Sequence, residues 1–186
     1  MRILLHDCCA PWGANVALEL KNNGYDVTVY FYNPNIFPED EYRLRLAEMK
    51  RFCREQEIKF IETPYERNDW QLAVQGLENE PERGKRCAQC FTHRLAEAAQ
   101  KAQELGVDTF ATTLTMSPLK DAGLINKIGK ELADIYGLEF LDTVWRENGG
   151  DRKAIELSKK YDFHRQNYCG CEFAMRTDEK SIDQAD

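Results

Sequence analysis

Residues 1–12 read MRILLHDCCAPW, and this stretch sets the expectation for the fold. The apolar run Ile3–His6 predicts a short buried strand, and Ala14–Lys21 has the pattern of a helix. Cys8 and Cys9 lie between them, after the predicted strand and before the predicted helix. A strand, a turn and a helix form the first unit of an alternating α/β chain.

The same alternation continues along the chain. Runs of β-branched and aromatic residues predict strands, and apolar residues at helical spacing predict helices. The expected strands are Val27–Tyr32, Lys59–Thr63, Thr109–Thr115 and Glu139–Val144, and the expected helices are Glu41–Gln56, Trp70–Leu77, Cys90–Leu105, Asp121–Tyr136 and Arg152–Tyr161, with a polar loop over Glu78–Arg86. This order predicts an α/β fold, a single-domain Rossmann-like parallel sheet with helices on both faces. Chemistry in such folds gathers at the carboxyl ends of the strands, so we expect a cysteine-rich site there.

The length of 186 residues is that of one ordinary domain. We expect a single catalytic domain over residues 1–176 and a polar C-terminal tail over residues 177–186. The N-terminus lacks the pattern of a signal peptide, and no apolar run approaches the ~18 residues that span a bilayer. We therefore expect a cytoplasmic protein with no membrane partner, in which free thiols persist.

Six of the seven cysteines come in three close pairs: Cys8-Cys9, Cys87-x-x-Cys90 and Cys169-x-Cys171. In a chain without an export signal, such grouping indicates a metal, a metal–sulfur cluster or a redox couple more than a structural disulfide. The first two pairs lie at or near predicted helix N-termini, which favour thiolates. Four thiolates fit a [4Fe-4S] cluster or a tetrahedral zinc ion, and the CxxC pair also suits a dithiol/disulfide couple.

The CxC pair is too tight for an unstrained disulfide, so it indicates reactive thiols or ligands. Tyr168 directly precedes this pair and is a candidate proton donor, although a buried aromatic residue is the commoner role. The seventh cysteine, Cys53, falls inside a predicted helix beside apolar residues, and we expect it in the core. The three histidines, His6, His93 and His164, are single and unclustered. We expect His6 to pack at the end of its strand. His93, three residues past Cys90, could face the site, but we expect a structural role for it.

The net charge of −7 argues against a general binder of phosphate backbones. Basic residues nevertheless cluster at Arg83, Lys85 and Arg86, just before Cys87, and basic residues outnumber acidic ones over residues 151–176. These charges either solvate helices or form a basic rim that suits a polyanion. The chain contains neither a P-loop nor a GxGxxG motif, so ATP and nicotinamide are not supported as substrates.

Several motifs together resemble the QueH-type epoxyqueuosine reductases over about residues 3–173. They are HDCCAP after the first strand, FYNPNIFPEDEY after the second, GLENEPERGKRCAQCFTHRL, TTLTMSPLKD after the fourth and RQNYCGCEF near the end. The resemblance implies a nucleotide-hydrolase-like fold and an enzyme that reduces the epoxide of epoxyqueuosine in tRNA to queuosine without cobalamin. It also implies an iron–sulfur cluster and allows an additional mononuclear iron.

Carried onto this sequence, the resemblance implies Cys8, Cys9, Cys87 and Cys90 as the metal and cluster ligands. Cys169 and Cys171 would be redox or second-metal groups at the same site, with Tyr168 and Asp7 as further catalytic candidates. If the substrate is tRNA, the basic clusters are the expected phosphate contacts, namely Arg83, Lys85, Arg86, Arg152, Lys153 and Arg165. The reaction also requires an electron donor such as a ferredoxin or flavodoxin. Family members carry Cys or Asp after CCAP, but this chain has Trp12, which cannot ligate a second iron.

Two other functions are compatible with the same cysteines. A zinc-stabilised RNA-binding module would use four thiolates as a structural site. A thiol-disulfide oxidoreductase would use Cys87 and Cys90 alone, which leaves the other two pairs without a role.

Overall fold

The strands form one five-stranded parallel sheet in a computed structural model of the chain, which describes residues 1–175. The sheet order is β3-β2-β1-β4-β5, so the chain builds outward from β1 on one side and then returns to build the other side. The predicted α/β architecture is confirmed. The strands are β1 (Arg2–His6), β2 (Asp26–Phe31), β3 (Lys59–Glu62), β4 (Thr109–Thr112) and β5 (Glu139–Phe140).

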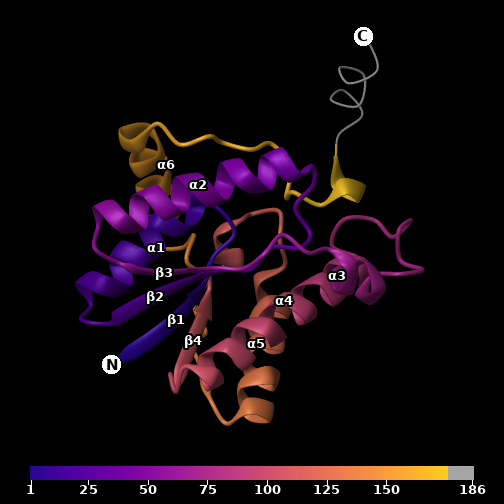
Figure 1. The fold of residues 1–186 in the computed structure, drawn as a ribbon, viewed down its shortest axis with the longest axis horizontal. Helices are drawn as coiled ribbons and strands as arrows, with labels where there is room; N and C mark the ends of the chain where they lie inside the picture. The colour runs from indigo at the N-terminus through magenta and orange to yellow at the C-terminus, as the bar shows by residue number, and fades with distance from the viewer. Residues whose placement is uncertain (176–186) are drawn as a thin grey trace.

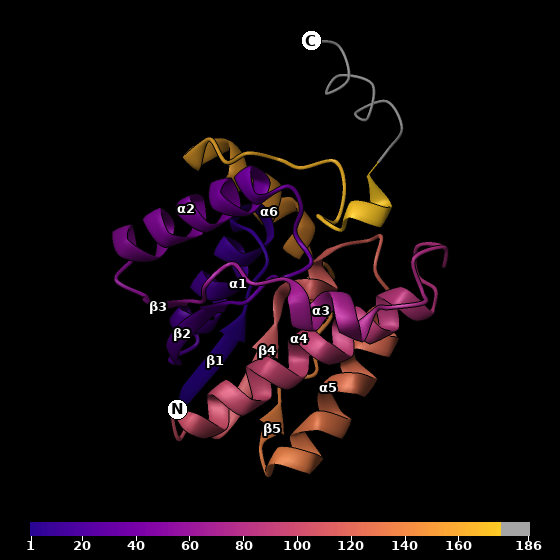
Figure 2. The same ribbon diagram turned by 45° about the vertical axis from the view of Figure 1, so that its right-hand side comes forward.

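Helices cover both faces of the sheet (Figures 1 and 2). One face carries α1 (Ala10–Asn22), α2 (Glu39–Glu55) and α6 (Gly150–Tyr161), and α6 packs mainly against α1. The other face carries α4 (Lys85–Glu104) and α5 (Ala122–Tyr136), with the short α3 (Asn68–Ala73) beside α4. The central strand is therefore apolar on both faces, and both Leu4 and Leu5 are fully buried.

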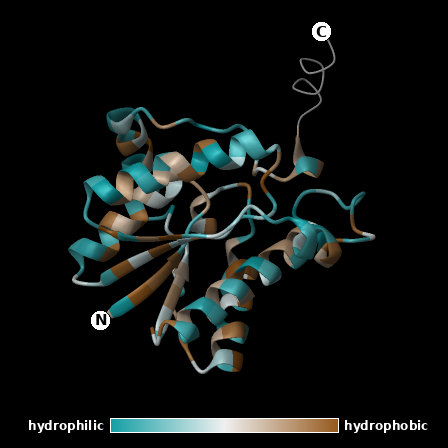
Figure 3. Ribbon diagram, viewed as in Figure 1, coloured by the Kyte–Doolittle hydropathy of each residue, from teal (hydrophilic) through white to brown (hydrophobic). Residues whose placement is uncertain are grey.

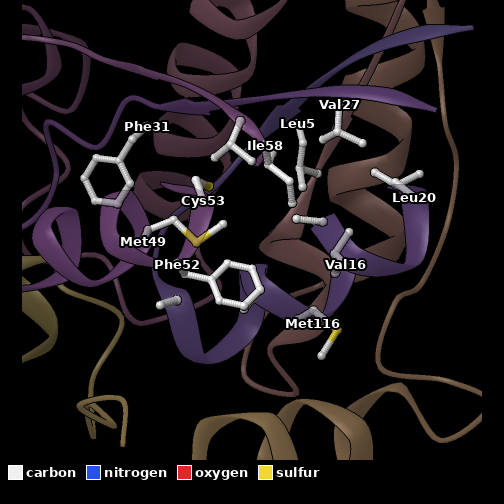
Figure 4. Packing of buried hydrophobic residues seen from close by; sticks show 14 of the residues in the cluster. Leu5, Val16, Leu20, Val27, Phe31, Met49, Phe52, Cys53, Ile58 and Met116 are labelled. Atoms are coloured by element: carbon white, nitrogen blue, oxygen red, sulfur yellow. The ribbon is translucent and has the colours of Figure 1, made fainter. Parts of the chain in front are cut away.

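Each face of the sheet has its own apolar core. In the core beneath α1 and α2, Phe31, Met49 and Phe52 surround Cys53, which confirms the structural role expected for this cysteine (Figure 4). The second core lies between the sheet and α4 with α5, and it includes Cys8 and Cys9. In Figure 3, hydrophilic residues predominate along the helices, whereas the strands of the sheet contain long apolar stretches.

The ends of several elements differ from the sequence prediction, and the largest difference concerns α4. This helix begins at Lys85 rather than Cys90, because the Glu80 carboxylate accepts a hydrogen bond from the Lys85 backbone N–H at 3.1 Å. Cys87 and Cys90 therefore both lie on the first turns of a helix. Similarly, α1 begins at Ala10 with Cys9 as its N-cap, four residues before the predicted start.

The two later strands are shorter than predicted. β4 ends at Thr112, whose hydroxyl accepts a hydrogen bond from Leu114 N at 3.2 Å and starts the 3-10 helix η1 (Thr113–Met116). Only Glu139–Phe140 of the fifth predicted strand pairs with β4. Within residues 1–175, no helix combines the length and apolar character needed to cross a bilayer. The predicted tail, residues 177–186, lies outside the described part of the chain.

Gly13 in α1 leaves room for a buried carboxylate, and this generates a stability prediction. A Cβ at this position would lie 1.8 Å from Asp7 Oδ1, so we expect Gly13→Ala to lower the free energy of unfolding by about 1–3 kcal/mol through overpacking. The matched control is Gly123→Ala in α5, where the new Cβ would meet Asp121 Oδ1 at an ordinary 3.4 Å. Urea unfolding of both variants checks the prediction, and equal stability of the two would contradict it.

Candidate metal centre

The candidate site lies where β1 and β4 end side by side in the sheet. These strands are neighbours in the sheet but far apart in the chain, and ligands of open α/β sheets bind at such a reversal of strand order. The segment after β1 carries Asp7, Cys8 and Cys9, and the segment after β4 begins with Thr113. The Thr113 hydroxyl lies 3.9 Å from Cys8 Sγ, so the two segments meet at this edge.

The first cysteine pair forms the start of α1. Cys9 is the N-cap residue, and the two sulfur atoms of Cys8 and Cys9 lie 3.7 Å apart. The side-chain amide of Gln166 donates a hydrogen bond to Cys9 Sγ at 2.9 Å. The contact connects the cysteine pair to the segment that follows α6, more than a hundred residues away in the chain.

Asp7 is fully buried beside this pair. Its Oδ1 accepts a hydrogen bond from the Thr113 hydroxyl at 3.0 Å, and its Oδ2 has no hydrogen-bond partner within residues 1–175. Burial, reinforced by the neighbouring Cys8, raises the pKa of Asp7 well above its ordinary value. Burial therefore favours the protonated form of this side chain.

The other two cysteine pairs line one pocket, which we call the cysteine pocket. Cys87 and Cys90 come from α4, and Cys169 and Cys171 come from the segment after α6. Cys90 and Cys171 also pack against the buried ring of Trp70 from α3. These four thiols, separated by about eighty residues of sequence, are brought together by the fold.

A second cavity adjoins the cysteine pocket and contains Cys8. Cys8 and Trp12 line it from one side, and Cys169 belongs to both hollows. Leu119 and Lys120, from the segment after η1, also line both. All three cysteine pairs therefore meet around two adjoining spaces, since Cys9 lies in contact with Cys8.

The CxC segment is held by the turn that follows β2. Ile36 and Cys171 form an antiparallel bridge, and Phe37 N donates to Gly170 O at 2.8 Å. Gly170 has φ +101°, and a Cβ there would lie 3.0 Å from Ile36 and 3.1 Å from Arg45. The Tyr168 hydroxyl donates a hydrogen bond to the carbonyl of Phe37. The hydroxyl proton that made Tyr168 a candidate proton donor is therefore engaged in holding the segment in place.

The thiols differ in their tendency to ionise. A hydrogen bond from Cys171 lowers the pKa of Cys169 to about 6, and the same interaction raises the pKa of Cys171. A hydrogen bond from Cys9 likewise lowers the pKa of Cys8. Burial raises the pKa of both Cys87 and Cys90.

The basic residues expected at a tRNA surface do not share one environment. Lys85, Arg152, Lys153 and Arg165 are exposed. Arg86 is only 2% exposed, and its guanidinium donates to the carbonyls of Leu77, Glu78 and Glu80, so the structure corrects its assignment to a solvent-facing rim.

Arg83 is exposed at the rim, but its guanidinium is already engaged. It donates to the carbonyls of Pro118 and Leu119 at 2.8 and 2.9 Å. These contacts hold the segment that carries Lys120 against the CxxC end of α4.

Sequence patterns missed three cationic residues at the site. Lys120 lines both spaces, Arg94 lines the cysteine pocket and Arg45 lines the adjoining cavity. Lys120 belongs to the TTLTMSPLKD motif after the fourth predicted strand. Its place beyond the end of a strand could have identified it as a residue of the site. Arg45 and Arg94 lie inside amphipathic helices, where an arginine resembles an ordinary surface residue.

The histidines take part in the fold rather than in the cysteine site. His6 Nδ1 lies 2.9 Å from the Thr112 hydroxyl and Nε2 lies 3.2 Å from Tyr32 O, and burial lowers the pKa of His6 well below its ordinary value. His93 Nε2 lies 2.9 Å from the Tyr32 hydroxyl. His164 Nε2 lies 3.3 Å from the Glu41 carboxylate. These contacts fit the structural roles expected for His6 and His93.

The donor chemistry of the site suits a thiolate-bound centre. Within residues 1–175, no three His, Cys, Asp or Glu side chains are arranged to hold a single metal ion. The seven cysteines are all free thiols, and four of them line one pocket that also contains several cationic side chains. Iron–sulfur clusters are held by four thiolates, so this set of donors fits a cluster by number and by type.

Comparison with known families matches residues 3–177 to the model described as epoxyqueuosine reductase QueH. The chain belongs to the QueH family. It is 42% identical over 180 residues to the epoxyqueuosine reductase QueH of Histophilus somni (strain 129Pt), covering 96% of this chain and 74% of that protein. It is 33% identical over 176 residues to the QueH of Thermotoga maritima, covering 93% and 90%. The QueH family places the protein among the oxidoreductases of queuosine biosynthesis.

Two solved structures have a similar fold. The U34-tRNA thiolase NcsA from Methanococcus maripaludis, solved with its [4Fe-4S] cluster, has a TM-score of 0.64 and 12% identity, with coverage of 98% of this chain and 64% of that one. A predicted subunit of a tRNA methyltransferase from Methanocaldococcus jannaschii has a TM-score of 0.50 and 14% identity over 75% of this chain and 66% of that one. At these identities, the similarity to the two structures establishes only the fold of this QueH chain.

The asymmetry of the CxC pair gives a testable titration. Since the pKa of Cys169 is about 6, we expect iodoacetamide to label Cys169 in the metal-free protein with a midpoint far below the ordinary thiol value of ~8.5. The variant Cys171→Ala removes the stabilising hydrogen bond and should raise that midpoint, whereas Cys171→Ser retains a donor and should raise it less. Peptide mass spectrometry across pH measures each midpoint, and an unchanged midpoint in Cys171→Ala would contradict the assignment.

Proposed function

We propose that this QueH protein removes the epoxide oxygen from epoxyqueuosine in tRNA, using electrons from a [4Fe-4S] cluster held at the cysteine pocket. The observation that carries the proposal is the meeting of three distant cysteine pairs around two adjoining spaces at the strand ends. The reduction converts the epoxide into an alkene and water with two electrons and two protons. The family supports the reaction, and the cluster bound by the structural neighbour NcsA supports the cofactor.

The shared pocket favours one choice of cluster ligands. Cys87, Cys90, Cys169 and Cys171 line the same space, so we propose these four as the thiolates around the cluster. This differs from the set expected from the sequence, in which Cys8 and Cys9 accompanied the CxxC pair. When bound, such a cluster supplies electrons one at a time. Cys8 and Cys9 then remain for the additional iron, which stays a prediction with Trp12 beside Cys8.

The adjoining cavity is where we propose that the modified nucleoside binds. Trp12 offers an aromatic face for stacking an unpaired base, which is how proteins commonly hold single-stranded RNA. Lys120 lies at the boundary of the two spaces and contributes a cation and N–H donors next to the thiols. We propose that its ammonium group orients the epoxide oxygen toward the cysteine pocket.

Protons for the departing oxygen have a source in the fold. Burial raises the pKa of Asp7 and so favours its protonated form, and the Thr113 hydroxyl contacts both Asp7 Oδ1 and Cys8 Sγ. We propose that the Thr113 hydroxyl rotates to accept the proton of the Asp7 carboxyl group and releases its own proton toward the edge of the cavity, which leaves Asp7 as the carboxylate. Tyr168 is a weaker candidate than the sequence indicated, because its hydroxyl already donates to Phe37.

Phosphate binding would fall to the exposed cations. We propose that Lys85, Arg152, Lys153 and Arg165 contact the tRNA backbone, with Arg83 at the rim. A ferredoxin or flavodoxin remains the proposed electron donor, and the cytoplasm the proposed location.

Loss of a ligand should remove the metal together with the activity. We expect Cys87→Ser and Cys90→Ser, purified without oxygen, to lose bound iron, sulfide and the visible absorbance of the cluster. The matched control is Cys53→Ala, which alters a core cysteine and should keep all three. Elemental and sulfide analysis measures the outcome. The proposal would be contradicted if the wild-type protein contained zinc and no sulfide, or if both serine variants kept the iron content of the wild type.

Binding of tRNA should respond strongly to salt. Removing a single cation that touches a phosphate lowers the slope of log K against log salt by about 1, so we expect Lys85→Ala and Arg165→Ala each to weaken binding and flatten this slope. Lys59→Ala, at an exposed lysine that pairs with Asp26, should leave both unchanged. Fluorescence anisotropy with the anticodon stem-loop from low salt to ~200 mM measures the slope. Identical slopes for the wild type and all three variants would refute the phosphate contacts.

A further inference from the structure

Two buried N–H groups beside the cysteine pocket have no hydrogen-bond acceptor of any kind among the described residues. Trp70 is fully buried and packs against Cys90 and Cys171, and Arg94 is 2% exposed and lines the pocket beside Cys90. These groups are Trp70 Nε1 and Arg94 Nε, and neither has a partner within residues 1–175. Leaving a buried donor unsatisfied costs about 1–3 kcal/mol, so two such groups beside one sulfur atom suit an anionic acceptor at that place. Both side chains also act to lower the pKa of Cys90, against the larger effect of burial.

The charge of Arg94 is also uncompensated. Two other arginines packed near the CxC segment, Arg45 and Arg67, pair with Glu41 at 2.7 Å and with Glu172 at 2.6 Å. Arg94 donates to the neutral amide oxygen of Asn33 and forms no ion pair with any carboxylate of residues 1–175. A buried charge without a partner is costly, and the pocket therefore favours an anion near Arg94.

The lining of the cysteine pocket points the same way. Among its described residues, Glu82 is the only carboxylate, against the four cations Arg83, Arg86, Arg94 and Lys120. A thiolate-bound cluster is anionic, and each added electron makes it more so. Nearby cations and N–H donors to ligand sulfur stabilise the more negative state, and hydrogen bonding of this kind is a recognised control on cluster potentials.

We propose that Trp70 and Arg94 donate N–H···S hydrogen bonds to Cys90 and thereby raise the reduction potential of the centre. Both act as positioning residues, because they contact the ligand sulfur and not the substrate. The inference rests on the proposed cluster. Arg94 acts mainly through its positive charge, whereas Trp70 acts through the direction of its neutral N–H donor. The short helix α3 then has a function, since it places the Trp70 indole against the CxxC turn of α4.

The test is a redox titration of the whole protein, purified with its cluster and reduced stepwise with dithionite. Arg94→Gln removes the charge, and we expect a ratio of reduced to oxidised centre about tenfold lower at a fixed potential, a shift of about 59 mV for one electron. Trp70→Phe keeps an aromatic ring and removes only the N–H, so a smaller shift in the same direction is expected. Arg94→Lys keeps the charge and should lie closer to wild type.

The matched control is Arg54→Gln, which makes the same chemical change at an exposed position near the end of α2. Its potential should equal that of the wild type. If Arg94→Gln does not fold, Trp70→Phe still reports the shift, with Arg94→Lys as the variant that keeps the charge. A wild-type protein without iron and sulfide would overturn the proposed function itself. A wild-type cluster whose potential is unchanged in Arg94→Gln and Trp70→Phe would overturn this inference alone.

Discussion

The antiparallel bridge between Ile36 and Cys171 is the contact on which the cysteine pocket depends. The parallel sheet alone brings the first cysteine pair to the strand ends, and α4 brings the second pair. The third pair lies on a segment with little regular structure, and backbone hydrogen bonds to the turn after β2 hold it in place. Gly170 makes this approach possible, because its left-handed backbone and missing side chain leave room for Ile36 and Arg45.

This dependence explains why motifs far from the cysteines matter to the site. The turn Asn33–Phe37 after β2 contributes no thiol, yet it receives the CxC segment and the Tyr168 hydroxyl, while Asn33 accepts a hydrogen bond from Arg94. Arg83 has a similar role on the other side of the pocket, where it fixes the backbone that leads to Lys120. The site is therefore a junction of four chain segments whose backbones hold one another.

The sequence alone predicted the sheet and the grouping of the cysteines, because both depend on local signals. Alternating strand and helix patterns identify the parallel sheet, and cysteine spacing identifies candidate ligands. Which pairs share a pocket depends on side-chain packing over long sequence distances, so the sequence paired Cys87 and Cys90 with Cys8 and Cys9 while the structure places them with Cys169 and Cys171. Arg86 is a second example of what the sequence does not reveal. It lies among charged residues in the sequence, and nothing there indicates that its guanidinium donates to three carbonyl groups inside the fold.

The placement of the CxC pair also separates assembly of the scaffold from completion of the site. Both large apolar cores are built from residues up to Phe163, and the segment that carries Cys169 and Cys171 joins neither. During synthesis on the ribosome, the sheet and its covering helices can form before these last two thiols emerge. A nascent chain at that stage would present only two of the four thiols that line the cysteine pocket, Cys87 and Cys90, so the full set of donors is complete only once the CxC segment has docked on the turn after β2.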